Sequence, residues 1–253
     1  MMKYVILVVC LMLGLFCATG YAAIPLITDD SGTQGKGKFQ LEVAGEYAHD
    51  KEEGVTNKDS TFAAALTYGL ADTVDIVLCV PYQALRSDEA GYKTRKNGMS
   101  DLSIETKWRI YEKEGLSFAL KPGFTIPTGD DEKELGAGKM TYYLYFITSK
   151  EMAPWSFHLN LAYFRNENKG DDRKDIWHVS AASTVEVMKG LKLVGDIGVE
   201  TNPEAASGNS PAYILGGLIY SPAENIDIGF GVKGGLTKSE TDIAVRSGIT
   251  YRF

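Results

Sequence analysis

Residues 38–48 read Lys-Phe-Gln-Leu-Glu-Val-Ala-Gly-Glu-Tyr-Ala, and apolar side chains alternate along this stretch with polar or small ones. Successive side chains of a β-strand point to opposite faces, so a strand here would have one apolar and one polar face. The apolar face would consist of Phe39, Leu41, Val43, Gly45 and Tyr47. The opposite face includes the carboxylates of Glu42 and Glu46. Such a strand separates an apolar environment from a polar one.

The same alternation recurs along most of the chain, in segments of about ten residues. These segments lie at 62–70, 74–82, 102–110, 116–126, 155–163, 177–187, 191–199, 226–232 and 243–253. Two further segments, 140–148 and 213–220, are apolar on both faces, and the pattern leaves their orientation open. Strands with one apolar and one polar or small face are typical of barrels that span a membrane. We therefore predict an all-β fold, a transmembrane antiparallel up-and-down β-barrel of about twelve strands.

The connections between these segments alternate in length. Short turns are predicted near 69–73, 112–115, 150–154, 188–190 and 222–225, and longer polar loops near 49–59, 84–99, 129–139, 165–175 and 202–210. In bacterial barrels the short turns face the periplasm and the long loops face outward. A soluble β-sandwich would also alternate. It would need neither an even number of strands nor aromatic side chains at both ends of its apolar faces, so we favour the membrane barrel.

The first residues have the pattern of a secretory signal peptide. A lysine follows the two initial methionines, residues 5–16 are uncharged and apolar, and small residues surround Ala22. Such a leader is removed on export, whereas a membrane-spanning helix would need about 20 apolar residues. We therefore predict a signal peptide at 1–22, a periplasmic N-terminal segment at 23–37 and a barrel in the bacterial outer membrane at 38–253.

The segment at 23–37 allows two interpretations. It contains Asp29, Asp30 and several glycines, and it could fold into the lumen as a small plug. It could also remain a periplasmic tail that pins the first strand. We expect the tail.

Charge and motifs argue against several classes of function. The formal net charge of −7 disfavours nucleic acid as a partner. No zinc-ligand spacing, phosphate-binding loop or nucleophile elbow occurs, so we expect no metal, no cofactor and no enzymatic activity. Ser156, His158 and Asn160 would share one strand face, but residues two apart on a strand lie about 7 Å apart, too far for a nucleophile to contact its base.

If the polar faces converge, they line a lumen that contains both signs of charge. The candidate lumen-lining residues are Glu42, Glu46, Asp75, Glu105, Lys107, Arg109, Lys121, His158, Asn160, Lys192, Asp196, Glu200, Asp227, Lys233, Arg246 and Arg252. Such charges can tune the selectivity of a pore, or they can pair with one another and fill a small, rigid barrel. The sequence leaves both interpretations open.

The last eight residues, Arg-Ser-Gly-Ile-Thr-Tyr-Arg-Phe at 246–253, resemble the C-terminal assembly signal of bacterial outer-membrane proteins. Gly248, Tyr251 and the final Phe253 carry the resemblance. It implies that the barrel-assembly machinery recognises this end of the chain.

Several short motifs resemble a known outer-membrane family. They are Pro-Leu-Ile-Thr-Asp-Asp-Ser-Gly-Thr at 25–33, Gly-Lys-Gly-Lys-Phe-Gln-Leu-Glu at 35–42, Leu-Thr-Tyr-Gly-Leu at 66–70, Val-Pro-Tyr at 80–82 and Ile-Pro-Thr-Gly-Asp at 126–130. In these motifs the chain is similar to the family labelled as the phenol-degradation meta-pathway transporter. The resemblance implies a barrel channel that passes aromatic or other hydrophobic compounds.

We therefore predict an outer-membrane channel, or passive transporter, for small solutes that include aromatic or hydrophobic compounds. The expected partners are the lipid and lipopolysaccharide of the outer membrane, the barrel-assembly machinery and the solute itself. A closed barrel that serves adhesion or envelope structure is one alternative. An outer-membrane enzyme that modifies lipids is another.

Overall fold

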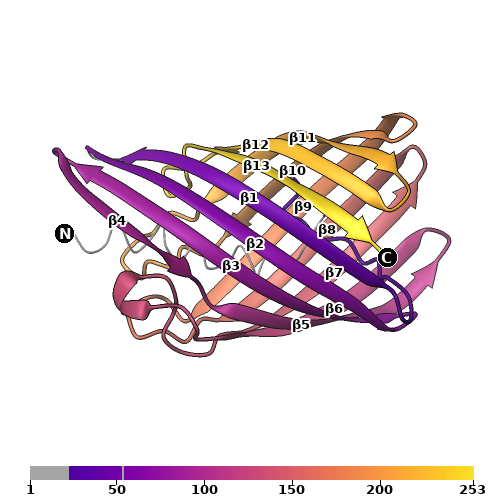
Figure 1. Ribbon diagram of the computed structural model, residues 1–253, viewed down its shortest axis with the longest axis horizontal. Helices are drawn as coiled ribbons and strands as arrows, with labels where there is room; N and C mark the ends of the chain where they lie inside the picture. The colour runs from indigo at the N-terminus through magenta and orange to yellow at the C-terminus, as the bar shows by residue number, and fades with distance from the viewer. Residues whose placement is uncertain (1–22, 53) are drawn as a thin grey trace.

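The computed structural model describes residues 23–52 and 54–253, and the predicted signal peptide at 1–22 lies outside them. The described chain forms an antiparallel β-barrel with one short 3-10 helix (Figure 1). In chain order its elements are β1 (Phe39–Glu52), β2 (Val55–Ala71), β3 (Val74–Glu89), β4 (Tyr92–Met99), β5 (Leu102–Lys113), β6 (Leu116–Ile126), η1 (Asp131–Lys133), β7 (Tyr142–Met152), β8 (Trp155–Arg165), β9 (Asp175–Met188), β10 (Leu191–Glu200), β11 (Ala212–Ala223), β12 (Ile226–Gly235) and β13 (Ile243–Arg252). Among the described residues, no helix is long and apolar enough to span a membrane.

The connections distinguish the two ends of the barrel. The tight turns β2–β3, β5–β6, β7–β8, β9–β10 and β11–β12 lie at the end that holds the C-terminus, at the right of Figure 1. We call this the short-turn end, and we call the opposite end the long-loop end. The five predicted short turns are confirmed.

The sheet closes on itself. β1 pairs with β2 on one side and with β13 on the other, and β2 also pairs with β3. β4 and β5 share β3 as a neighbour, because β4 pairs with the long-loop half of β3 and β5 with its short-turn half. When β4 and β5 are counted as one interrupted strand, the barrel has twelve strands, and the predicted all-β fold is confirmed.

Two of the predicted long loops are wrong, because residues 49–59 and 84–99 form hairpins. β1 and β2 continue to a turn at Gly54, and β3 and β4 meet at Ala90 and Gly91. These last two residues have positive φ angles of 51° and 87°, as the type I′ turn of a two-residue hairpin requires. Toward their tips these strands carry polar side chains on both faces, so they lack the alternation by which a membrane strand is recognised.

The segments 140–148 and 213–220, whose orientation the sequence left undecided, carry apolar side chains that point into the barrel. In β7 the buried, inward-facing side chains are those of Tyr143, Tyr145 and Ile147. In β11 they are those of Tyr213, Leu215 and Ile219. Part of the barrel interior is therefore apolar, which explains why both faces of these strands lack charge.

The outward face of the wall is apolar and exposed. Phe62 in β2, for example, is 56 % exposed. Aromatic residues border this face near the short-turn end at Phe39, Tyr68, Trp155, Tyr251 and Phe253, and near the long-loop end at Tyr47, Tyr82, Tyr163 and Trp177. An exposed apolar band with aromatic residues at both margins is the surface that outer-membrane barrels present to a bilayer.

The first and last strands join at the short-turn end. The backbones of Phe39 and Phe253 exchange two N–H to O=C hydrogen bonds of 2.8 and 2.9 Å. Their rings stack with centroids 5.5 Å apart. Phe253 therefore completes the ladder that closes the barrel.

Replacing Phe253 with Gln should lower the yield of folded barrel in the outer membrane several-fold, because the aromatic end of the assembly signal and its ring contact are both lost. Leu236→Gln is a matched control, since Leu236 follows β12 at the opposite end and is 54 % exposed. Heat-modifiable migration of the membrane fraction on a gel measures the folded barrel. An undiminished yield of F253Q would contradict the expectation.

Candidate functional site

The N-terminal segment lies inside the barrel. Most side chains from Ile24 to Ser31 are buried, and they contact inward-facing residues of β5, β6, β8 and β10. The segment enters at the short-turn end and crosses the lumen to the wall formed by β11–β13. The structure thus differs from the periplasmic tail expected at 23–37. The physical reason is that the charged lumen supplies partners for the polar groups of this segment.

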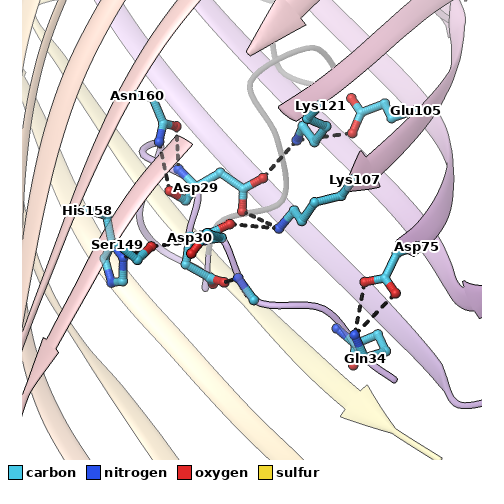
Figure 2. A network of polar contacts seen from close by, with 12 residues as sticks. Asp29, Asp30, Gln34, Asp75, Glu105, Lys107, Lys121, Ser149, His158 and Asn160 are labelled. Atoms are coloured by element: carbon cyan, nitrogen blue, oxygen red, sulfur yellow. Dashed lines mark hydrogen bonds and ion pairs between the residues drawn. The ribbon is translucent and has the colours of Figure 1, made fainter. Parts of the chain in front are cut away.

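Asp29 is the centre of the contacts that hold the segment, as Figure 2 shows. Its fully buried carboxylate accepts hydrogen bonds from Lys107 Nζ and Lys121 Nζ, each at 2.9 Å. Lys121 Nζ also lies 3.1 Å from Glu105. Two ammonium groups thus face two carboxylates. Removing one partner from such a buried set commonly costs about 3–5 kcal/mol, because the remaining charge loses its counter-charge.

Two wall residues bind the backbone of the segment. Asn160 Oδ1 accepts from Asp29 N at 2.7 Å, and Asn160 Nδ2 donates to Asp29 O at 2.8 Å. Asp196 in β10 accepts from the backbone nitrogens of Ile27 and Thr28, at 2.7 and 2.8 Å, and from the Thr28 hydroxyl at 2.7 Å. These side chains thus satisfy buried backbone groups that have no partner in a helix or a strand.

Further contacts follow the segment to the rim of the barrel. Ser31 N donates to Ser149 Oγ at 2.9 Å, and the same hydroxyl lies 2.9 Å from His158 Nδ1. Nearer the short-turn end, Gln34 N donates to the carboxylate of Asp75 at 3.0 Å. The segment is therefore fixed along its whole path, from β3 to β10.

The start of the described segment packs closely against glycines of β12 and β13. A Cβ atom at Gly229 would lie 1.9 Å from the carbonyl oxygen of Ile24, and one at Gly231 would lie 2.7 Å from Pro25. Gly248, predicted as part of the assembly signal, also faces the segment, because a Cβ there would lie 2.6 Å from Ile24 Cδ1. Glycine within a strand often marks such a close approach. A larger side chain at these positions would push the segment away from the wall.

The predicted lumen-lining residues divide into two groups. Those that contact the segment directly or through one neighbour are Asp75, Glu105, Lys107, Lys121, His158, Asn160 and Asp196. Those that pair within the barrel itself are Glu42, Glu46, Arg109, Glu200, Asp227, Lys233, Arg246 and Arg252. Lys192 is exposed near the short-turn end of β10. The structure thus brings most of the predicted residues into one lumen, where some bind the segment and others form separate pairs within the wall.

Sequence reasoning missed an apolar surface on the inner wall of β6–β9. It consists of Ala119, Tyr143, Tyr145, Ile147, Ala162, Phe164 and Ile176, and we call it the aromatic patch. The ring of Tyr145 meets Phe164 edge-on at 5.5 Å and lies 5.2 Å from Lys121 Nζ. Tyr145 is nearer the long-loop end of β7 than Ser149 is. The aromatic patch therefore adjoins the segment on the side of the long loops.

A loop at the long-loop end is tied to the wall by Asp101. Its carboxylate accepts from Gly129 N at 2.9 Å and from Ala137 N at 2.8 Å, so it holds both halves of the β6–β7 connection. Burial raises the pKa of Asp101, although these hydrogen bonds act in the opposite direction. The connection thus has a fixed position at the mouth of the barrel.

Carboxylates crowd the loop between β8 and β9. Burial, together with the charges of Asp171 and Glu204, raises the pKa of Asp172 to about 6. The mouth therefore gains negative charge as the pH rises through that value. Within residues 23–52 and 54–253, no group of three or more His, Cys, Asp or Glu side chains is arranged to hold a metal ion.

Comparisons with known proteins agree with this architecture. A family model described as "Putative MetA-pathway of phenol degradation" matches residues 23–253. The barrel is similar to an outer membrane channel from Pseudomonas putida F1, with a TM-score of 0.68 and 12 % identity over 88 % of this chain and 98 % of that one. It is also similar to the KdgM porin in complex with disordered oligogalacturonate (TM-score 0.55, 9 % identity, 83 % and 99 % covered). The NanC porin gives similar values (0.55, 9 %, 83 % and 98 %). No curated protein matches the sequence.

Replacing Gly229 with Val should displace the segment from the lumen, because the new side chain would occupy the position of the Ile24 carbonyl. Amide hydrogen exchange of the peptide that covers residues 24–33 should become much faster. Gly216→Val is the control, since a Cβ at Gly216 would meet nothing within 4 Å. Equal protection of the peptide in both variants would disprove the close approach.

Proposed function

This chain belongs to the family described as "Putative MetA-pathway of phenol degradation", and we propose that it is an outer-membrane channel for the passive transport of small solutes. One observation carries the proposal: the N-terminal segment occupies the lumen without joining the β-ladder of the wall. The hydrogen bonds between residues 24–34 and the wall use a side chain, either of the segment or of the wall. Such a segment can leave while every strand pair stays intact, so a path opens and the wall remains closed to lipid.

The solved structures of similar fold support this proposal. They include an outer membrane channel and two porins. Their similarity also supports a location in the outer membrane, where the exposed apolar band of this barrel would face lipid. The short-turn end would then face the periplasm and the long-loop end the exterior.

A closed structural barrel fits the lumen less well. Such a barrel would fill its interior with wall side chains that bond to one another. Here Lys107, Asn160 and Asp196 direct their hydrogen bonds to the segment. If the segment left, these groups would face water in a polar passage, which is the lining that a channel for small solutes needs.

An enzyme is the second candidate, because of one contact. Ser149 Oγ lies 2.9 Å from His158 Nδ1, a distance at which a base can activate a nucleophile. The same hydroxyl accepts a hydrogen bond from Ser31 N, so it is engaged by the segment. The Ser156, His158 and Asn160 arrangement considered from the sequence does not form this contact, since the partner of His158 comes from β7.

The segment should hold the channel closed at rest. When the segment leaves, Lys107 and Lys121 lose their ion pairs with Asp29. This loss costs several kcal/mol of free energy, which water and ions then offset in part. A conformation that lies a few kcal/mol above the resting one is populated only to about 0.1–10 %. A solute or a partner that binds the open form better would shift this balance.

The aromatic patch favours aromatic or hydrophobic solutes. Tyr145 and Phe164 are buried while the segment is in place, so a solute that enters from the long-loop end would contact them once the lumen opens, on the long-loop side of the position of Asp29. Aromatic rings in such contacts gain about 0.5–1.5 kcal/mol beyond the area that they bury. The family description, which refers to phenol degradation, supports the same class of solute.

Recordings from purified protein in planar lipid bilayers test the function. The intact chain should give rare, small conductance steps, and a variant that lacks residues 24–33 should give frequent, larger ones. Silence of both proteins, when folding is verified, would support the closed structural barrel. Hydrolysis of lipid by the same preparation, abolished by Ser149→Ala, would support the enzyme.

Asp29→Asn should raise the open probability by one or more orders of magnitude, because Lys107 and Lys121 lose their shared counter-charge. Asp30→Asn is the control, since this carboxylate accepts from Gly32 N in its own segment, and an amide oxygen can accept the same bond. Single-channel recording measures the effect. Equal open probabilities for D29N and D30N would show that the ion cluster does not hold the segment.

Tyr145→Ala should reduce the preference for phenol over a sugar of similar size by roughly two- to tenfold, as expected from the loss of one ring contact. Tyr142→Ala is the control, because the Tyr142 side chain is exposed on the outward face of the same strand. Solute flux into liposomes that contain the variant without residues 24–33 measures the preference. An unchanged ratio in Y145A would remove the aromatic patch from the transport path.

A further inference from the structure

β1–β4 carry an unusual set of charges on their outward face, beyond the apolar band. These strands extend farther than the others at the long-loop end (Figure 1). Three exposed cations on this face lie at one height, Lys58 in β2, Arg86 in β3 and Arg95 in β4, and we call them the basic row. Two further exposed cations, Lys51 in β1 and Lys93 in β4, lie nearer the hairpin tips. They occur in a chain whose formal net charge is −7.

The strand register places the basic row in one line. Arg86 pairs directly with Arg95. The pairs Ser60 with Ala84 and Asn57 with Ser87 set Lys58 opposite Arg86. Since neighbouring strands are about 4.8 Å apart, the three cations span roughly 10 Å.

No internal partner balances the basic row. Within the part of the chain that the structure describes, no carboxylate lies within ion-pair distance of the side-chain nitrogens of Lys58, Arg86 or Arg95, and Asp59 accepts from the backbone N–H of Arg86 at 3.1 Å. The nearby Asp88 pairs instead with Lys93, at 3.7 Å. Like charges directly opposite each other on a sheet are destabilising. A counter-charge from outside the chain would remove this repulsion.

The basic row has a constant height above the apolar band. Lys58 is four residues beyond Phe62, Arg86 is four residues beyond Tyr82, and Arg95 is four residues beyond Met99. Four residues of a strand correspond to about 13 Å, less when the strand is tilted. Phe62, Tyr82 and Met99 are exposed at the outer margin of the band. At the tilt of about 40° that is typical of such barrels, the backbone of the row lies about 10 Å above this margin, and its long side chains can reach down to the head groups of the outer leaflet.

We propose that the basic row binds the phosphate groups of lipopolysaccharide, at the lipid A head group. This inference rests on the outer-membrane location in the proposed function, but it does not depend on transport. Guanidinium groups bind phosphate through paired hydrogen bonds, and two arginines side by side match a lipid that carries more than one phosphate. The lipid would supply the counter-charge that the chain lacks, and its acyl chains would lie against the exposed rings below.

Lipid A binding to the purified full chain tests the proposal. The barrel is held in uncharged detergent, and native mass spectrometry counts the bound molecules of bisphosphorylated lipid A and of lipid A without phosphates. The wild type should prefer the bisphosphorylated form. The variant K58Q/R86Q/R95Q should lose this preference by roughly tenfold or more.

The control variant is R165Q/K169Q/K174Q. It removes the same number of charges at the long-loop end, but each of these cations already pairs with a carboxylate, at 2.8, 2.8 and 3.7 Å. It should bind lipid A like the wild type. If the triple variant of the row does not fold, R86Q and R95Q are measured separately, and each should weaken binding.

Three results would overturn the proposal. They are equal binding of bisphosphorylated lipid A by wild type and row variants, equal binding of lipid A with and without phosphates, and displacement of lipid A by millimolar inorganic phosphate alone, which would indicate a site for free anions.

Conductance of the row variant without residues 24–33 separates this inference from the channel. If the protein does not conduct but binds lipid A through the basic row, only the transport proposal is refuted. If it conducts but its binding of lipid A does not depend on the basic row, only the lipid site is refuted.

Discussion

Pairing of every backbone group in the wall is the constraint on which the rest of the structure depends. In hydrocarbon an unpaired N–H or C=O group costs several kcal/mol, so a sheet in a membrane must close. Here β1 pairs with β13, and β2 with β3, to complete the ring. Closure fixes which face of each strand points inward, and it thereby collects the polar side chains in one narrow lumen.

The charges of this lumen have two kinds of partner. Pairs such as Glu46 with Arg246, at 2.9 Å, join neighbouring strands and stay satisfied whatever else the lumen holds. Lys107 and Asp196 instead find their partners in residues 27–30. The first kind keeps the wall rigid. The second kind makes the occupancy of the lumen depend on one short stretch of chain.

The sequence predicted the wall well, because a strand with lipid on one side and water on the other must alternate. It predicted the lumen less well. The inward tyrosines of β7 broke the alternation, since an apolar interior removes the contrast between the two faces. The N-terminal segment was expected to be a periplasmic tail, because residues 24–31 show no periodicity that would indicate a place in the lumen. Its signal was in the wall, where Gly229 and Gly231 occupy inward positions that a side chain would normally fill. The hairpin tips escaped notice because water surrounds both of their faces.

The seam between β1 and β13 has a consequence for how the molecule forms. Its partners are far apart in the chain, for example Gln40 and Arg252, which are 212 residues apart. Contacts of such long range form slowly, because a long loop must close before they contribute. The ring cannot be completed until the last strand has been delivered. Residues 24–31 lie shortly before β1 in the chain. They can therefore enter the interior while the edges of β1 and β13 are still unpaired and the sheet is open. Pairing of these two strands would then enclose them.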